Sequence, residues 1–594
     1  MKRGYYFLLH KLISVAFAIF IVLTVEFVVL RVLEGPIIVP KYNYFGMADR
    51  TMEDWATNEP LPVQYFVFMK RMLTGDFGAS TGVWHGAGVS GAIYDYAART
   101  AALFAFAAFL SIALGTLFGV LASRWKDRVP GRAAALLELL LFSVSAFVFS
   151  ILIMWQIVER FHLNWPLMGT FSPDYQSMSA LERIWDFAMH AVLPIVSVVL
   201  ACFGGFALVV REGILKAMKE KEPGELGISS TDAGISIHPT HVSDAFLTFA
   251  PHSRLLIVWV LSCVLVTESA FVWQGLGRLL WSSASMYDFI VFQAVFFIIA
   301  LLAIVSIFAW DVVIFLSGRD GTKAAIETGI PEQAHFAASP GATAKLQSIW
   351  KEYKKSASGL IALCVILALG IMAIVGPMVV NVDFGALGPS NPNPVSYFVQ
   401  GGREHYLVVF LTVLMSTVLG VVAGAVSLEA KVLDRILMLL ADAFLILPLL
   451  PLVVAVVVTR FYASSSVLQI PLLLSVVMWA PIAMFVRNRT KSSREASRSC
   501  YKSPDAVWLH LRDALSVAKF VAVISTIALT FLELVVLYYP RSWGAAIERE
   551  YQHGGLTELS LNWILPVCGI VLLGMSFYKV LEHLERALTK VHEV

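Results

Sequence analysis

The sequence predicts an all-α integral membrane protein with two six-helix halves that repeat in the same orientation, about 12 transmembrane helices in all. Of the 594 residues, 58% are hydrophobic and only 14% are charged, which is typical of integral membrane proteins. Apolar runs about long enough to cross a bilayer recur along the chain. The loops rich in Lys and Arg all fall on one side of the membrane under this count. A net charge of +2 gives no reason to expect a nucleic-acid partner.

The first half is expected to comprise residues 1–316. Its first apolar run, 9–32, follows a basic start and is longer than the hydrophobic part of a signal peptide. We therefore interpret it as a retained span with its N-terminus inside. The mixed-charge segment 34–99 is predicted to be an extracytoplasmic region. Further spans are predicted at 101–122, 133–158, 188–210, 254–272 and 289–316.

A polar stretch, 317–355, carries six Lys and Arg residues and is predicted to be a flexible cytoplasmic linker. The second half, 356–594, then repeats the pattern of apolar runs, and both termini are expected in the cytoplasm. Its spans are predicted at 358–380, 407–427, 433–458, 467–486, 518–538 and 563–581.

The two halves resemble each other in detail, as a parallel repeat requires. The fourth span ends in Val-Arg in both halves, and a long cytoplasmic segment follows each time. Carboxylates occur at matching places in the third and fifth spans. Since an ionisable group is costly in lipid, we expect these carboxylates to pair with Arg, Ser or backbone groups and to hold the helices together, a proton relay being the alternative. They are Glu138 and Asp442 in the third spans and Glu268 and Glu533 in the fifth.

The long cytoplasmic segments lie at 211–253 and 487–515. We expect the second to form two short amphipathic helices, at 492–496 and 504–515, that hang below the membrane. Such a pair is a lever that a soluble partner can push. A solvated loop without a partner is the alternative that these features alone leave open.

Two classes of transporter share this outline. A secondary transporter of the major facilitator outline has its long insert only at the centre of the chain, whereas here each half has a second long cytoplasmic segment. The permeases of ATP-driven importers have such segments, and this favours them. The chain has no G-x-x-x-x-G-K-[ST] motif, so we expect ATP to be handled by another chain. A membrane scaffold or sensor on the same fold is a further alternative.

Several motifs resemble those of the oligopeptide and dipeptide ABC importer permeases, and they suggest both permease subunits fused in one chain. Residues 1–320 resemble the first subunit, and residues 345–594 resemble the second. The motifs of the first are Leu73-Thr-Gly-Asp-Phe-Gly78, Leu193-Pro194, Thr267-Glu-Ser-Ala-Phe271 and Gly275-Leu-Gly-Arg-Leu-Leu280. Those of the second are Leu433-Asp-Arg435, Arg494-Glu-Ala-Ser497 and Ser542-Trp-Gly544.

The resemblance implies a translocation subunit that performs no bond chemistry and binds no cofactor or metal. It implies as partners two ATPase subunits or domains that hold ATP and Mg, and an extracytoplasmic solute-binding protein. The expected solute is a peptide or similar small molecule, and the expected location is the cell (plasma) membrane of a prokaryote.

Candidate site residues follow from the same resemblance. The coupling signature, Glu-Ala-Ala followed by Gly, is altered in the second segment, where Tyr501 stands in place of the Gly, and it is barely recognisable in the first. The residues expected to meet the ATPases are Glu495, Ala496, Ser497, Trp508 and Arg512 in the second segment and Asp232, Ala233 and Gly234 in the first. The residues expected at an outer gate or a binding-protein docking ledge, or else in a simple chain reversal, are Gly275, Gly277, Arg278, Trp543 and Gly544.

Overall fold

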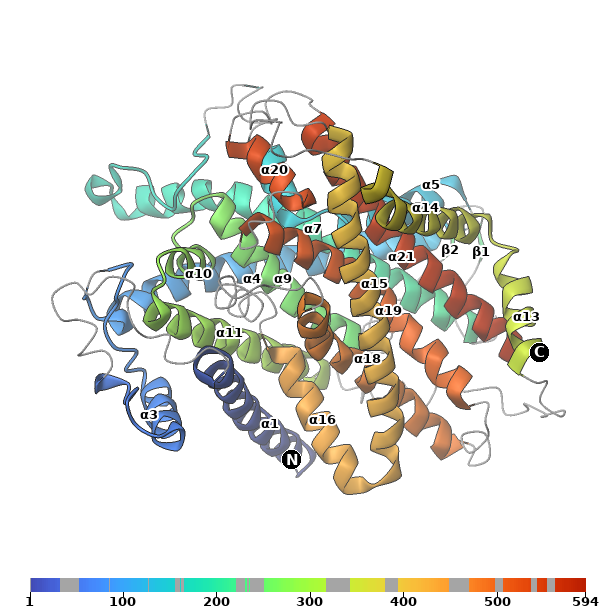
Figure 1. Cartoon of the computed structure of the whole chain (residues 1–594), viewed down its shortest axis with the longest axis horizontal. Coiled ribbons are helices and arrows are strands. Elements are labelled where there is room, and N and C mark those ends of the chain that lie inside the picture. Colours follow the sequence, from blue (N-terminus) through green and yellow to red (C-terminus); the bar gives the residue numbers. More distant parts are fainter. Residues whose placement is uncertain are drawn as a thin grey trace.

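The protein is an integral membrane protein made almost entirely of helices, as a computed structural model shows (Figure 1). In the residues that the structure describes, ten helices are long and apolar enough to cross a membrane, and a bent helix pair makes up to eleven. The structure describes residues 2–32, 53–84, 86–126, 128–154, 161, 165–220, 230–231, 234–235, 250–316, 342–379, 394–447, 469–496, 506–535, 542–552 and 561–593.

The first half contains six elements that correspond to the predicted spans, with short elements between them. The spans contain α1 (Lys2–Phe27), α4 (Val89–Arg124), α5 (Val129–Phe142) with α6 (Ala146–Ile151), α7 (Ala180–Glu220), α9 (Ala250–Ala270) and α11 (Phe289–Leu316). The short elements are η1 (Val28–Val32), α3 (Leu61–Thr74), η3 (Tyr175–Ser177), β1 (Ser230–Thr231), β2 (Gly234–Ile235) and α10 (Leu276–Ser285).

The second half also consists of long helices with short elements between them. Its longer helices are α14 (Ala357–Val379), α15 (Pro394–Val426), α16 (Lys431–Ile446), α18 (Gln469–Ala496), α19 (Ala506–Val535) and α21 (Leu561–Glu593). Its short elements are α13 (Ala342–Tyr353), η4 (Ser427–Glu429) and α20 (Trp543–Gln552). The predicted ninth span, 433–458, is described only as far as Leu447, where α16 ends.

The third span of the first half is broken, which corrects the prediction of one continuous helix over 133–158. Helices α5 and α6 meet at 93°. The Ser143 hydroxyl donates back to the Leu139 carbonyl at 2.7 Å, and the Ser145 hydroxyl accepts from the Phe147 amide as an N-cap of α6. Because these side chains satisfy backbone groups at the break, the chain can turn inside an apolar run.

The same pairs of helices pack together in both halves, and two short Gly motifs make the closest of these contacts. Helix α4 packs along α7 and α15 packs along α18. Gly115 and Gly119 of α4 face α7, where an added Cβ would lie 2.6 Å from Phe206 and from the Ala207 carbonyl. Gly420 and Gly424 of α15 are packed in the same way against Ile482 and Ala483 of α18. Small residues at this spacing let helix backbones approach closely in membranes.

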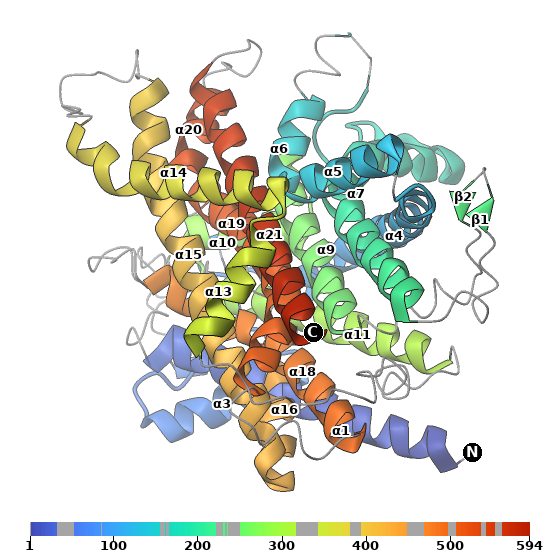
Figure 2. The same ribbon diagram turned by 90° about the vertical axis from the view of Figure 1, so that its right-hand side faces the viewer.

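The fifth span of each half lies at the centre of the molecule, and the first span of each half lies at its periphery. The most apolar stretch of α19 is 100% buried and that of α9 is 83% buried, against 33% for α1 and 28% for α14. Helix α1 of the first half packs on α16 of the second, and both views show the two side by side (Figures 1 and 2). The halves are therefore in contact both at the centre and at this edge.

Candidate functional site

The segment 487–515, which is predicted to be cytoplasmic, does not form the two separate short helices that the sequence predicts. Helix α18 runs without a break to Ala496, and α19 begins at Ala506 and continues into the membrane. The stretch 487–496 contains neither Gly nor Pro, so nothing in it ends a helix. Glu495 and Ala496 are thus the last residues of α18, whereas Ser497 and Tyr501 lie outside the described residues.

Trp508 and Arg512 both have partners within the chain. Trp508 is half-buried and packs on a small apolar cluster that includes Ile349 of α13 and Leu588 of α21. The Arg512 guanidinium donates to the Asp513 carboxylate at 2.8 Å. Their predicted part in binding an ATPase stays a prediction.

The segment 211–253, the other one predicted to be cytoplasmic, is described only in part. Gly234 lies in β2, opposite Thr231 of β1, in an antiparallel two-stranded ribbon. Asp232 and Ala233, between these strands, lie outside the described residues.

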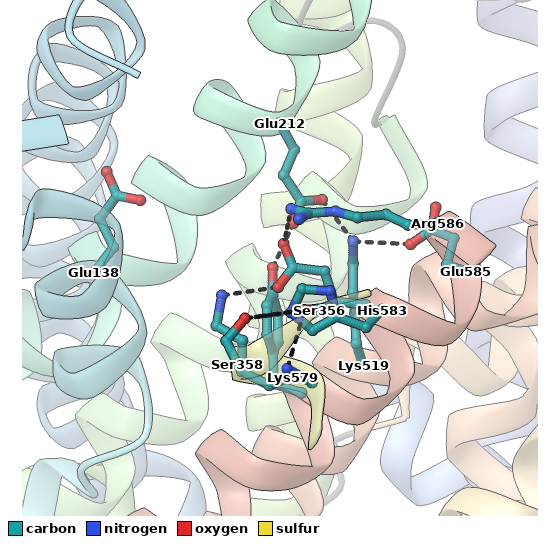
Figure 3. A network of polar contacts seen from close by, with 12 residues as sticks. Glu138, Glu212, Ser356, Ser358, Lys519, Lys579, His583, Glu585 and Arg586 are labelled. Atoms are coloured by element: carbon teal, nitrogen blue, oxygen red, sulfur yellow. Dashed lines mark hydrogen bonds and ion pairs between the residues drawn. The ribbon is translucent and has the colours of Figure 1, made fainter. Parts of the chain in front are cut away.

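The last part of the predicted linker is folded, which corrects the expectation of a segment with no fixed core. Helix α13 packs on α21, with Ile349 and Tyr353 buried between them. The Tyr353 hydroxyl donates to the Gly359 carbonyl at 2.8 Å, and burial raises the pKa of Tyr353 to about 12, so the hydroxyl keeps its proton. Just beyond α13, the His583 ring lies within 3.2 Å of Ser356 and 2.8 Å of Ser358 (Figure 3).

The turn after the fifth span of the first half is built around the Glu268 carboxylate. This carboxylate accepts from the Thr100 hydroxyl and from the Gly277 amide, both at 2.6 Å. The Thr100 oxygen in turn accepts from the Leu276 amide at 2.7 Å. Two amides at the start of α10 are therefore satisfied by side chains of α4 and α9.

The two glycines of this turn, Gly275 and Gly277, are buried. A Cβ on Gly275 would overlap the Glu268 carboxylate, and one on Gly277 would overlap the Leu265 carbonyl. Their small size thus lets α10 close over α9. Arg278 beside them is partly exposed. A role for the turn as an outer gate stays a prediction.

The corresponding turn of the second half is also buried. Trp543 is 1% exposed and Gly544 is buried, and their predicted part in an outer gate or docking ledge stays a prediction. The Trp543 ring stacks on Phe398 and donates its indole N–H to the Phe398 carbonyl at 2.9 Å. The His405 ring lies 4.7 Å away, between ring centroids.

Within each half, the Arg that ends the fourth span is paired with a carboxylate of the third. Arg211 donates to Glu138 at 2.8 Å. Arg487 donates to both oxygens of Asp434, at 2.8 and 2.5 Å. Asp442, which the sequence matches with Glu138, has a different partner.

Asp442 is paired across the two halves. Its carboxylate lies 3.3 Å from Arg254 of α9, whose guanidinium also donates to Asp311 of α11 at 2.7 Å. Lys11 of α1 approaches the other oxygen of Asp311 at 2.7 Å. Four charges of alternating sign thus join α1, α9 and α11 to α16. We call this set the Arg254 cluster.

A second charged set joins the halves at α7, α19 and α21, and we call it the Lys519 cluster (Figure 3). The Lys519 ammonium of α19 donates to Glu212 of α7 at 2.7 Å and to Glu585 of α21 at 3.1 Å. The Tyr578 hydroxyl of α21 also donates to Glu212. Glu212 of the first half therefore takes hydrogen bonds from two residues of the second.

Sequence reasoning missed both bases of these clusters, although a signal for them exists. Arg254 precedes Glu268 by 14 residues, and Lys519 precedes Glu533 by the same number. A basic residue repeated at this distance from a repeated carboxylate indicates matched sites. Glu533 itself lies in α19, but its side chain lies outside the part of the chain that the structure describes.

Comparison with known proteins adds to this geometry. The chain is 24% identical over 257 residues to a dipeptide transport system permease protein of Alkalihalophilus pseudofirmus, which covers 41% of this chain and 76% of that protein. It is 24% identical over 285 residues to an oligopeptide transport system permease protein of Bacillus subtilis, and the alignment covers 47% of this chain and 88% of that protein. It is 26% identical over 241 residues to a glutathione transport system permease protein of Salmonella typhi, and the alignment covers 40% of this chain and 72% of that protein. No family profile matches.

The predicted resemblance to peptide-type transport permeases is thereby confirmed. The aligned stretch takes in most of each relative but less than half of this chain. These relatives are therefore only about half as long as this chain, which leaves room for a second region of permease size.

Proposed function

We propose that this chain forms the translocation pathway of an ATP-driven ABC importer of the oligopeptide and dipeptide type. It carries peptides or similar solutes by alternating access, with both permease domains in one polypeptide. The observation that carries the proposal is the similarity to peptide-system permeases over a stretch that is most of each relative. The chain performs no bond chemistry, and ATP with Mg is held by separate ATPase subunits.

The matched packing of the two halves supports the fused arrangement. Helices α4 and α7 pack through a G-x-x-x-G motif on α4, and α15 and α18 pack through another on α15. Each fifth span is followed by a ten-residue helix, α10 or α20, that packs back on it. A parallel repeat with its central contact between α9 and α19 suits a pathway that opens to one side at a time.

The proposed orientation follows from the basic loops. The chain lies in the cell membrane of a prokaryote with both termini in the cytoplasm. An extracytoplasmic solute-binding protein then meets the side that contains the region 34–99, and the ATPases meet the segments 211–253 and 487–515.

Coupling in this proposal runs through helices that leave the cytoplasmic side. Helix α7 leads into the first segment, and α18 and α19 are the two arms of the second. Because these arms are continuous with spans, a force on the segment tilts the spans directly. When the ATPases close on ATP, the halves rock as rigid bodies, and the pathway changes sides.

Reconstitution tests this function. The chain is purified in mild detergent with its co-purifying ATPases, placed in proteoliposomes, and assayed for ATP-dependent uptake of a labelled oligopeptide delivered by the companion binding protein. We expect uptake that needs ATP and both partners. Uptake driven by an ion gradient without ATPases would instead indicate a secondary transporter, and absence of both ATPases and uptake would indicate a scaffold or sensor.

Glu495 gives the cleaner test of the second segment, because Trp508 also supports the apolar cluster around α13. Glu495→Ala at the end of α18 is expected to lower ATPase co-purification and solute-stimulated ATP hydrolysis several-fold. Glu59→Ala, an exposed residue on the opposite side in the proposed orientation, is the matched control and should behave like the parent. Equal behaviour of both variants would contradict a coupling role for this segment.

A further inference from the structure

Arg254 and Lys519 are matched bases on the two central helices, and each joins the halves in the same manner. Each contacts one carboxylate on the sixth span of its own half, Asp311 for Arg254 and Glu585 for Lys519. Each also contacts one carboxylate of the opposite half, Asp442 or Glu212. The contacts within each half therefore correspond, whereas the contact across the halves goes to the third span in one cluster, Asp442 on α16, and to the fourth span in the other, Glu212 on α7.

Each base lies on the helix that follows a cytoplasmic segment. Arg254 is the first residue after the segment 211–253, four residues into α9. Lys519 lies on α19, which leaves the segment 487–515, and its partner Glu212 lies on α7, which enters the first segment. Movement of either segment must therefore act on these ion pairs.

The contacts across the halves differ in strength. Lys519 is 4% exposed and lies 2.7 Å from Glu212, which also accepts from buried Tyr578. If the halves separated here, Lys519 would keep Glu585 of its own half, but Glu212, whose side chain is only 14% exposed, would lose both of its donors. Removing the partners of a largely buried charge is strongly destabilising.

The contact between Arg254 and Asp442 is the weaker of the two. It is 3.3 Å long, and the side chains are 19% and 26% exposed. If Asp442 moved away, Arg254 would keep its hydrogen bond and ion pair to Asp311 in its own half. Asp442 is partly in contact with solvent, so its separation leaves no fully buried unpaired charge, and partly exposed pairs contribute little.

We propose that the two clusters have unequal parts in transport: the Lys519 cluster is the pivot about which the halves tilt, and the contact between Arg254 and Asp442 is a latch that opens and closes. This inference rests on the importer function proposed above. It names positioning residues for that function, and it makes the motion asymmetric although the halves are a repeat.

Distance measurements between spin labels on the full chain test the geometry. One pair, at the exposed positions Val313 and Ile436, lies on α11 and α16 on either side of the latch. The other, at exposed Leu137 and Leu572, lies on α5 of the first half and on α21, the helix that carries Tyr578 and Glu585 of the pivot. On trapping the ATPases with ATP and vanadate, we expect the first distance to change at least about threefold more than the second, as for a hinge. An equal or larger change at the pivot would overturn the inference.

Absence of change in both distances would have a different meaning. If the parent chain imports peptide in proteoliposomes while neither distance changes, the latch is refuted and the importer function stands. If the parent neither imports peptide nor binds ATPases, the proposed function fails at the reconstitution assay, before the labels are used.

Variants that each break one ion pair distinguish the role of the latch from that of the pivot. Asp442→Asn opens the latch, so it should raise ATP hydrolysis in the absence of solute about threefold or more while the complex stays assembled. Asp434→Asn is the matched control, since it lies on the same helix and breaks an ion pair within one half. It should leave the solute dependence of hydrolysis unchanged.

Glu212→Gln weakens the pivot and should lower peptide uptake about tenfold or more. Its control is Glu138→Gln, which breaks an ion pair within the first half. Tyr578→Phe removes only the second donor to Glu212 and should have a smaller effect in the same direction. If Asp442→Asn abolished uptake while Glu212→Gln preserved it, the assignment of latch and pivot would be reversed and therefore wrong.

Discussion

The turns after the fifth spans of the two halves occupy corresponding places and are held by opposite means. In the first half, small residues on the turn let α10 close over Glu268. In the second half, a large residue on the turn, Trp543, enters space left by glycines on other helices. An added Cβ on Gly401 of α15 or on Gly569 of α21 would lie 2.5 or 2.7 Å from its ring.

The backbone amides at the starts of α10 and α20 also find their hydrogen-bond acceptors in different ways. The Leu276 amide donates to Thr100 of α4, 176 residues away in the sequence, and the Gly277 amide donates to Glu268 of the preceding helix α9. The Ala545 amide of α20 donates to Ser542, its own N-cap, at 3.1 Å. The difference teaches that a repeated architecture does not require repeated contacts. The first turn depends on tertiary contacts between helices, and the second on one bulky anchor and a local cap.

The largest effect is expected when the anchor of the second turn is removed. Trp543→Ala leaves a cavity among α15, α20 and α21 and leaves the Phe398 carbonyl without its indole donor. Such a truncation typically costs about 3–5 kcal/mol. Equilibrium unfolding in mixed detergent micelles measures this loss, with Trp185→Ala, at a 68% exposed residue, as control. A loss no larger than in the control would contradict an anchor role.

The next largest effect is expected at the first turn, which requires small residues where the second turn requires a large one. Gly277→Ala places a Cβ against the Leu265 carbonyl, where backbone faces backbone, so α10 must shift away from α9. Overpacking of this kind costs about 1–3 kcal/mol, occasionally more. Gly91→Ala is the matched control, because a Cβ there meets nothing within 4 Å and Ala favours a helix. Relative to the parent, the free energy of unfolding should fall for Gly277→Ala and rise for Gly91→Ala. Similar free energies for the two variants would show that the turn tolerates side chains.

Much of the fold could be predicted from the sequence, because apolar runs and basic loops are properties of composition. The break between α5 and α6 could not, since Ser143 and Ser145 are unremarkable within an apolar run until their hydroxyls are seen to satisfy the backbone. Gly275 and Gly277 marked a turn correctly, but a turn motif does not say whether the turn is exposed or buried.

The candidate site was harder to predict than the spans. Lys519 stands at the edge of a predicted span, and Arg254 begins another, so both resembled the usual basic residues at a membrane surface. Their carboxylate partners lie from 57 to 307 residues away in the sequence. Only tertiary structure brings them together, and only then does the repeated spacing to Glu268 and Glu533 acquire a physical meaning.

A smaller effect is expected from replacing the carboxyl group at the first turn with an amide of similar size. Glu268→Gln has one oxygen for the two donors, Thr100 and Gly277, so one hydrogen bond is lost or weakened. A buried group left unsatisfied costs about 1–3 kcal/mol. The double variant Glu268→Gln with Thr100→Val should lose less free energy of unfolding than the sum of the two single variants, because both residues belong to one hydrogen-bond network. Additive losses would indicate that Glu268 is held by contacts other than these.

The smallest effect is expected at the local cap of the second turn. Ser542→Ala removes the hydroxyl that accepts from the Ala545 amide but leaves Trp543 in its place, and the loss of an N-cap typically costs about 1 kcal/mol. The same measurement should therefore rank this variant below Trp543→Ala and Gly277→Ala. Since the hydroxyl is buried, Ser542→Thr keeps the acceptor while adding a methyl group, and it separates loss of the cap from crowding. If Ser542→Ala were as damaging as Trp543→Ala, the second turn would depend on its cap rather than on its anchor, and the contrast with the first turn would disappear.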